Sequence, residues 1–227
     1  MAMSQRLLLA DPDSAADALT FAGRAARVTV EGVRLRADGG VLVMTAAPLA
    51  PRGFGDPTPT VLALRTLAAD PELECDLVVD ASALLAVADD PRALELPETA
   101  LSPAWAGITP PRSGWDARLG IEASTLAAQA QAGIARVAET VPTDAGDDVV
   151  RTVRAAVWGA PSEELGGLPL GVAYAALSLG FVSGGETARV FANGPWTRIS
   201  LTRGHVLVRG PVATGLTAVR RTGPAAG

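Results

Sequence analysis

The spacing of apolar residues along the chain predicts about five helices. In 123–141, Leu126, Ala130 and Ile134 recur at intervals of four, which places their side chains on one face of a helix. Near the N-terminus, Asp11 followed by Pro12 is typical of a helix cap and first turn. The segments predicted to be helical are 11–24, 58–70, 123–141, 144–159 and 168–181.

Alternation of apolar and polar residues predicts strands. A glycine-containing turn between two alternating segments indicates a β-hairpin, and the chain has two such turns, at Asp38-Gly39 and Arg203-Gly204. Helices combined with mainly antiparallel strands, with hairpins near both ends of the chain, predict an α+β fold. The expected strands are 28–36, 41–45, 77–79, 94–96, 196–201 and 205–209.

The two predicted hairpins, 33–44 and 197–209, resemble each other. Each has a basic first strand, a glycine turn and a Val-Leu-Val return strand, and each follows a predicted helix. Two origins explain the resemblance between the hairpins. One is an ancient duplication, which would make the fold pseudo-symmetric, and the other is convergence between unrelated hairpins. We predict one compact α+β domain over 1–227, with a subdivision allowed near 110–120. The end, 212–227, is either a last strand or a disordered tail.

Composition narrows the chemistry that the chain can perform. Hydrophobic residues make up 48% of the chain, enough for a globular protein with a large core. All 19 basic residues are arginine, so neither a lysine Schiff base nor a lysine-containing P-loop is available. Cys75 and His205 are the only cysteine and histidine, which excludes intramolecular disulfides and Cys/His zinc sites within one chain. We expect no cofactor and no metal.

The longest uncharged stretch, 165–185, is a weak candidate for a membrane span. It contains six glycines and a proline, and acidic residues rather than basic ones precede it. A membrane helix is more apolar and has basic flanks, so a buried core helix is the better interpretation. The N-terminus lacks an apolar run long enough for a signal peptide. We expect a soluble cytoplasmic protein without a membrane partner.

Four carboxylates surround a short buried strand: Glu72, Glu74, Asp76 and Asp80. Carboxylates in a row can bind Mg²⁺ or Ca²⁺, but the simpler interpretation is that most are solvated and that Asp80 caps a following turn. Asp80 also lies at the carboxyl end of the strand, where sites of α/β proteins often form, so it stays a candidate acid or base. Cys75 is interpreted as a small buried hydrophobe.

Charge is distributed unevenly along the chain. The net charge is −5, which argues against nonspecific binding to nucleic acid, so we expect no nucleic-acid partner. After Glu186, however, the chain has six arginines and no acidic residue, so the last 41 residues carry +6 and residues 1–186 carry −11. This arginine-rich end includes the second hairpin.

The register expected for this hairpin places like charges opposite each other. A two-residue turn at Arg203-Gly204 pairs position 201 with 206, and that register sets Arg198 opposite Arg209 with His205 nearby. Like charges across a ladder are unfavourable unless something negative covers them. The cover is either an acidic part of residues 1–186, or solvent and salt, or a partner, for which an acidic protein surface and a small anion are the candidates.

The segment 101–115 contains Trp105, Trp115 and three prolines. Residues before proline avoid the helical region, so this segment is expected to run extended over the body of the fold. Exposed tryptophan is costly to leave in water, and interfaces are enriched in Trp and Arg. The two tryptophans are therefore either plugs that fix a long loop to the core or walls of a groove or contact surface.

These patterns favour a non-catalytic binding or protein-interaction module, and we expect a homodimer. The alternative is an enzyme that acts on a small anion held by Arg198 and Arg209, with His205 or Asp80 moving a proton. A carboxylate beside His205 in a cleft would favour the enzyme. The candidate contact residues for ligand or partner are Arg198, Arg209, His205, Arg203, Trp105 and Trp115.

Overall fold

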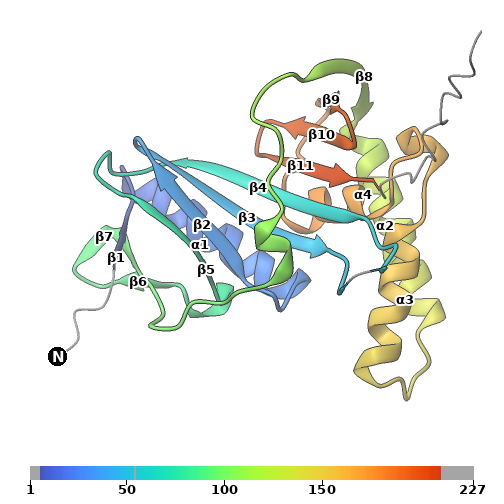
Figure 1. The fold of residues 1–227 in the computed structure, drawn as a ribbon, viewed down its shortest axis with the longest axis horizontal. Helices are drawn as coiled ribbons and strands as arrows, with labels where there is room; N and C mark the ends of the chain where they lie inside the picture. The colour runs from blue at the N-terminus through green and yellow to red at the C-terminus, as the bar shows by residue number, and fades with distance from the viewer. Residues whose placement is uncertain (1–5, 54, 211–227) are drawn as a thin grey trace, which may run out of the picture.

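The computed structural model describes residues 6–53 and 55–210, and most of its strands form one open antiparallel sheet (Figure 1). The order across this sheet is β5-β2-β3-β4-β11-β10-β9-β8. The bounds are β2 Val33–Asp38, β3 Val41–Leu49, β4 Thr60–Ala68, β5 Cys75–Val79, β8 Asp116–Glu122, β9 Thr187–Asn193, β10 Trp196–Leu201 and β11 Gly204–Arg209.

A small second sheet and several helices complete the described chain. The second sheet has the order β1-β7-β6, with β1 at Arg6–Leu8, β6 at Leu85–Val87 and β7 at Asp90–Glu95. The α-helices are α1 Pro12–Val28, α2 Ala123–Thr140, α3 Asp147–Gly159 and α4 Gly171–Ser178. Short 3₁₀ turns occupy Ala81–Ala83 (η1), Ala104–Gly107 (η2) and Glu163–Leu165 (η3).

The main core lies between one face of the large sheet and the helices. Alternation along β2 and β3 turns Val33, Leu35, Leu42 and Met44 into this core, where they join buried residues of α1, α2 and α4. We call the opposite face of the sheet its outer face. In Figure 1, α1 lies against the blue strands of the first half, and α2–α4 gather at the other end of the molecule.

The strand β4 lies where the sequence pattern predicts a helix over 58–70, and that prediction is wrong. Its first residues, from Thr60 to Ala63, are all at most 4% exposed, because β4 is a central strand that is covered on both faces. A strand buried on both faces loses its alternation, so Val61, Leu64 and Leu67 matched a helical period by accident. In the part of the chain that the structure describes, the α-helices are therefore four rather than five.

The remaining helices lie where the sequence pattern predicts them, but their first residues and one of their ion pairs differ. In α1, the side chain of Asp11 accepts a hydrogen bond from the Ser14 amide at 2.7 Å, as a capping residue should. The helix α3 begins at Asp147, and Arg151 pairs with Asp148 rather than with Asp147. The helix α4 begins at Gly171, three residues later than expected.

The sheet is pseudo-symmetric about the β4–β11 pair. On one side a helix, α1, precedes the meander β2-β3-β4, and on the other α4 precedes the meander β9-β10-β11, so the last strand of each meander meets its counterpart at the centre. The hairpin equivalent to β2–β3 is then β9–β10. The similar sequences 33–44 and 197–209 occupy hairpins that are not equivalent, which favours convergence for that likeness.

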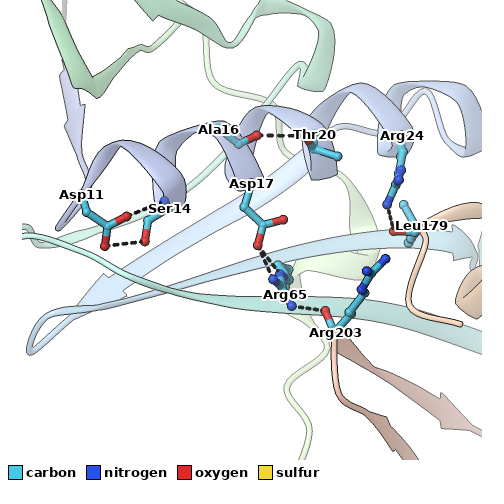
Figure 2. A network of polar contacts seen from close by, with 9 residues as sticks. All are labelled: Asp11, Ser14, Ala16, Asp17, Thr20, Arg24, Arg65, Leu179 and Arg203. Atoms are coloured by element: carbon cyan, nitrogen blue, oxygen red, sulfur yellow. Dashed lines mark hydrogen bonds and ion pairs between the residues drawn. The ribbon is translucent and has the colours of Figure 1, made fainter. Parts of the chain in front are cut away.

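Polar contacts on the helical side join the two halves across this centre (Figure 2). Arg65 of β4 donates hydrogen bonds to the carboxylate of Asp17 on α1 and to the backbone carbonyl of Arg203 in the β10–β11 turn. Arg24 of α1 donates to the carbonyl of Leu179, just after α4, at 3.0 Å. These contacts support the single domain predicted for 1–227, which stays a prediction, and the predicted tail at 212–227 lies outside the described residues.

Candidate functional site

The segment between β7 and β8 crosses the outer face of the sheet and forms a roof over it (Figure 1). It runs extended apart from the short turn η2. Hydrogen bonds hold it at both ends and in the middle: Leu101 N to Val78 O (2.7 Å), Arg34 Nη1 to Ala106 O (2.7 Å) and Asn193 Nδ2 to Ser113 O (2.8 Å). The roof is therefore fixed to β5, β2 and β9, that is, to both halves of the sheet.

Between the roof and the sheet lies a cavity of about 390 Å³, which we call the roofed groove. Its floor is the outer face of β2, β3, β4, β10 and β11, and its roof is formed by Trp105, Trp115 and residues 108–112. The apolar part of the floor consists of Val41, Val43, Leu62, Leu64 and Leu207. The basic groups that line the groove are Arg34, Arg36, Arg112, Arg198 and His205.

The two tryptophans of the roof have different environments. Trp105 is 2% exposed and packs in a second apolar cluster with Leu62, Leu207 and Trp196, so it is a plug that attaches the roof to the sheet. Trp115 is half-buried, and its indole N–H donates to the carbonyl of Pro111 at 3.1 Å. Both tryptophans also line the groove. The two alternatives drawn from the sequence, a plug and a groove wall, are therefore compatible with each other.

The second hairpin has a different register from the one expected. Arg198 pairs with Leu207, and Arg209 pairs with Trp196, so the two arginines do not face each other. The turn is Thr202-Arg203, because the carboxylate of Glu186 accepts hydrogen bonds from the amide and hydroxyl of Thr202 at 2.9 and 2.8 Å. The slip is an even number of residues, so each side chain keeps its predicted face.

Arg198 is the most unusual cation of the groove. Its guanidinium carbon lies 4.7 Å from the ring centre of Phe191 and 4.8 Å from that of Trp115. Its Nε is buried and has no hydrogen-bond partner among the described residues. Desolvation and the neighbouring Arg189 lower the pKa of Arg198, as expected for a guanidinium with aromatic neighbours and no counter-ion.

His205 lies in the groove without the partner that an acid–base catalyst needs. Its Nδ1 is buried and unpartnered within 6–53 and 55–210. Burial, and then the charges of Arg198, Arg189 and Arg65, lower its pKa. Among the described residues, the one acidic residue that lines the groove is Asp38 on β2, and β3 and β4 separate it from β11. Three strand spacings alone put it at least about 14 Å from His205, and the register aligns His205 with Arg34 rather than with Asp38.

At the other end of the groove, the charge of Arg34 is compensated. Arg34 Nε and Nη2 donate to the two carboxylate oxygens of Asp76 at 2.6 and 2.8 Å. These hydrogen bonds raise the pKa of Arg34 and lower that of Asp76. Arg34 and Arg36 were not among the candidates drawn from the sequence, although alternation in VRLRAD over 33–38 places both on one face of the strand.

The other candidate residues lie outside the roofed groove. Arg209 is on the outer face beside Trp196, and Arg203 lines a smaller cavity of about 170 Å³ between α1 and the β10–β11 turn. Asp80 is exposed and accepts hydrogen bonds from the hydroxyl and amide of Ser82, which lower its pKa, as a cap does. Cys75 is half-buried, and desolvation raises the pKa of its thiol.

Metal clusters and membrane-spanning helices are both absent from the described residues. Within them, no group of three or more His, Cys, Asp or Glu side chains is arranged to hold a metal ion. No helix in this part of the chain combines the length and the apolar character that are needed to cross a membrane.

Comparison with known proteins finds two families, one for each half of the chain. A family described as a domain of unknown function (DUF8010) matches residues 3–107, and another described as a domain of unknown function (DUF8185) matches residues 110–213. The boundary between them falls in the roof. No curated protein matches the sequence.

Solved structures with a similar fold are sliding clamps. The DNA polymerase III beta subunit clamp of Bartonella birtlesii, with griselimycin bound, is 14% identical, with a TM-score of 0.50 over 92% of this chain and 66% of that one. The clamp of Caulobacter crescentus is 14% identical (TM-score 0.49, 97% and 69% covered), and the beta subunit of Pseudomonas aeruginosa 12% (TM-score 0.48, 99% and 69% covered). The chain thus spans about two thirds of the length of these clamps.

At such low identity the likeness concerns the fold, and it confirms the predicted α+β class with internal pseudo-symmetry. It also corrects one expectation. The prediction of no nucleic-acid partner rested on a net charge of −5, but the chains of similar fold include a DNA polymerase III beta subunit sliding clamp. Net charge is therefore not a sound ground for excluding nucleic acid here.

Proposed function

We propose that this protein is a non-catalytic binding module that takes its partner in the roofed groove. The observation that carries the proposal is Arg198, a cation without an acidic partner among the described residues, whose guanidinium carbon lies 4.7 and 4.8 Å from two aromatic ring centres at the wall of a cavity. Such a group favours a negatively charged partner, because bidentate hydrogen bonds from a guanidinium to an anion are among the strongest in proteins.

An enzyme is the weaker alternative. A general base needs a group that orients it and a reacting proton within hydrogen-bond reach. His205 has arginines rather than a carboxylate as its charged neighbours. Its lowered pKa keeps it neutral near pH 7, so it can accept or donate one hydrogen bond to a partner. A homodimer and a cytoplasmic location also stay predictions. The strand where a second copy would pair is β8, an edge of the large sheet, because the roof already bonds to the other edge, β5, at Val78.

The test uses anilinonaphthalene sulfonate, an aromatic anion whose fluorescence rises when it enters an apolar site. We expect it to bind to the purified full chain and to receive excitation energy from the groove tryptophans. Changing Arg198→Gln should weaken binding more than about tenfold, since a hydrogen bond to a charged group contributes about 1.5–3 kcal/mol.

The matched control is Arg27→Gln, which removes an exposed arginine from the last turn of α1, on the helical side of the sheet. Its affinity for the probe should equal that of the unchanged protein. Equal affinities for the Arg198 and Arg27 variants, with both folded by circular dichroism, would show that the probe binds elsewhere and would refute the groove as the binding site.

A further inference from the structure

The shape of the roofed groove indicates a small occupant. Its volume of about 390 Å³ lies in the range of about 300–1,000 Å³ that is usual for small-molecule sites. A stable protein interface needs about 800 Å² from each partner, and here the chain's own segment 101–115 already covers much of the outer face. A small molecule therefore fits the groove better than a second protein does.

The unpartnered polar groups of the residues that line the groove are mostly hydrogen-bond donors, so they favour a ligand that accepts hydrogen bonds. Arg198 Nε and Trp105 Nε1 are N–H donors, buried and without a partner in the described chain. His205 Nδ1 is in the same state and can donate in one of its tautomers. Leaving such groups unsatisfied costs free energy, and all three belong to residues that line the groove. Because the charged residues of the lining are mostly cationic, an anionic group such as a carboxylate is the favoured occupant.

The register brings Arg198 and His205 close together on the floor. Arg198 faces Leu207 across the β10–β11 ladder, and His205 lies two residues before Leu207, on the same face. Diagonal neighbours of this kind are about 7–8 Å apart, a separation that one ligand can span. The charged end of an occupant is thereby assigned to the β10–β11 side of the groove.

Between Arg198 and the arginines of β2, the groove has an apolar stretch. Leu62 and Leu64 point from β4 into the floor, and Pro110 and Pro111 lie in the roof above. A slot between a sheet face and a roof that contains tryptophan suits a planar body, because aromatic rings stack favourably in this way. No acidic side chain other than Asp38 lines it.

Building on the proposed function, we propose that the roofed groove binds a small organic carboxylate with a planar apolar body. The carboxylate accepts hydrogen bonds from Arg198, and the body lies over Leu62 and Leu64 beneath the roof. The groove recognises the charge at one end of the ligand and the apolar surface of its body. Neither feature alone is sufficient for tight binding.

The experiment is displacement of bound anilinonaphthalene sulfonate from the full chain by three compounds. Naphthoate has both features, naphthalenemethanol keeps the rings without the charge, and acetate keeps the charge without the rings. We expect naphthoate to displace the probe at concentrations at least tenfold lower than either of the others.

Two arginine variants make the assignment specific. Arg198→Lys keeps the charge but loses the planar fork, and we expect naphthoate to bind it at least fivefold more weakly. Arg209→Gln is the matched control, because Arg209 also has a buried, unpartnered Nε in the same hairpin but does not line the groove. Its affinity for naphthoate should be unchanged.

The outcomes separate this inference from the proposed function. Equal displacement by naphthoate and naphthalenemethanol would overturn the proposal that the groove recognises a carboxylate. Displacement by a glutamate-rich peptide but not by naphthoate would overturn the proposal that the ligand is a small molecule. In both cases the groove would remain a binding site, provided that the probe's own affinity depends on Arg198. If that affinity is independent of Arg198, the proposed function itself fails.

Discussion

The surroundings of His205 differ strongly from those of a histidine side chain in water. It is the only histidine of the chain, and burial, with Arg198, Arg189 and Arg65 nearby, lowers its pKa from the ordinary 6.5. The folded protein therefore binds this proton more weakly than the unfolded chain does. Stability that depends on neutral His205 is present above pH 6.5 and is lost as the pH falls below it.

We predict that His205→Gln flattens this dependence. Between about pH 7 and about pH 5, the free energy of unfolding of the unchanged protein should fall more steeply than that of the variant, as measured by urea denaturation at several pH values. The imidazole pKa, followed by NMR, should lie below 6.5. Parallel slopes, or a pKa above that value, would contradict the burial described for His205.

At the scale of elements, a close contact joins α2 and α3. A Cβ added at Gly133 of α2 would lie 2.2 Å from the ring of Trp158 on α3, so only glycine allows the two helices this approach. We predict that Gly133→Ala lowers the free energy of unfolding by about 1–3 kcal/mol through overpacking, despite the better helix propensity of alanine.

The control is Gly23→Ala on α1, where an added Cβ meets nothing within 4 Å. Alanine there should stabilise the protein by up to about 1 kcal/mol, because glycine is a poor helix former. Both values come from chemical denaturation followed by circular dichroism. Destabilisation of equal size at the two positions would show that the Trp158 contact is not the cause.

Local patterns predicted some elements and failed for others for one physical reason. The helix α1 was foreseen because its cap and first turn lie within a few residues of sequence. The strand β4 was not, because its partners β3 and β11 and its covering roof are set by distant parts of the chain. The groove combines both cases. Its Trp105, Trp115, Arg198 and His205 were candidates from the sequence, but Arg34, Arg36, Arg112 and the apolar floor required the sheet order.

At the scale of the molecule, the contacts of Arg65 connect the two halves. Its side chain is 24% exposed, and it bonds α1 through Asp17 and the β10–β11 turn through the carbonyl of Arg203. We predict that Arg65→Met lowers the free energy of unfolding by about 1–3 kcal/mol, because it leaves partly buried acceptors unsatisfied. Tryptophan fluorescence and far-ultraviolet circular dichroism should report one shared midpoint for each protein.

The matched control is Arg151→Met, which breaks another Arg–Asp pair, one whose partner Asp148 is 87% exposed. Exposed pairs contribute about 0–1 kcal/mol, so this variant should be close to neutral. All four tryptophans lie beyond residue 100, whereas circular dichroism also reports α1. Midpoints that differ between the two probes would contradict the prediction of a single domain over 1–227.

The pairing of β4 with β11 also matters while the chain is being made on a ribosome. The strand β4 emerges early, and its partner β11 is the last strand of the described chain. In the interval, β4 is an unpaired edge that is apolar on both faces, the kind of strand that associates with other chains. A nascent chain that stalls between these strands therefore exposes a segment that is prone to aggregation, and pairing with β11 removes that hazard.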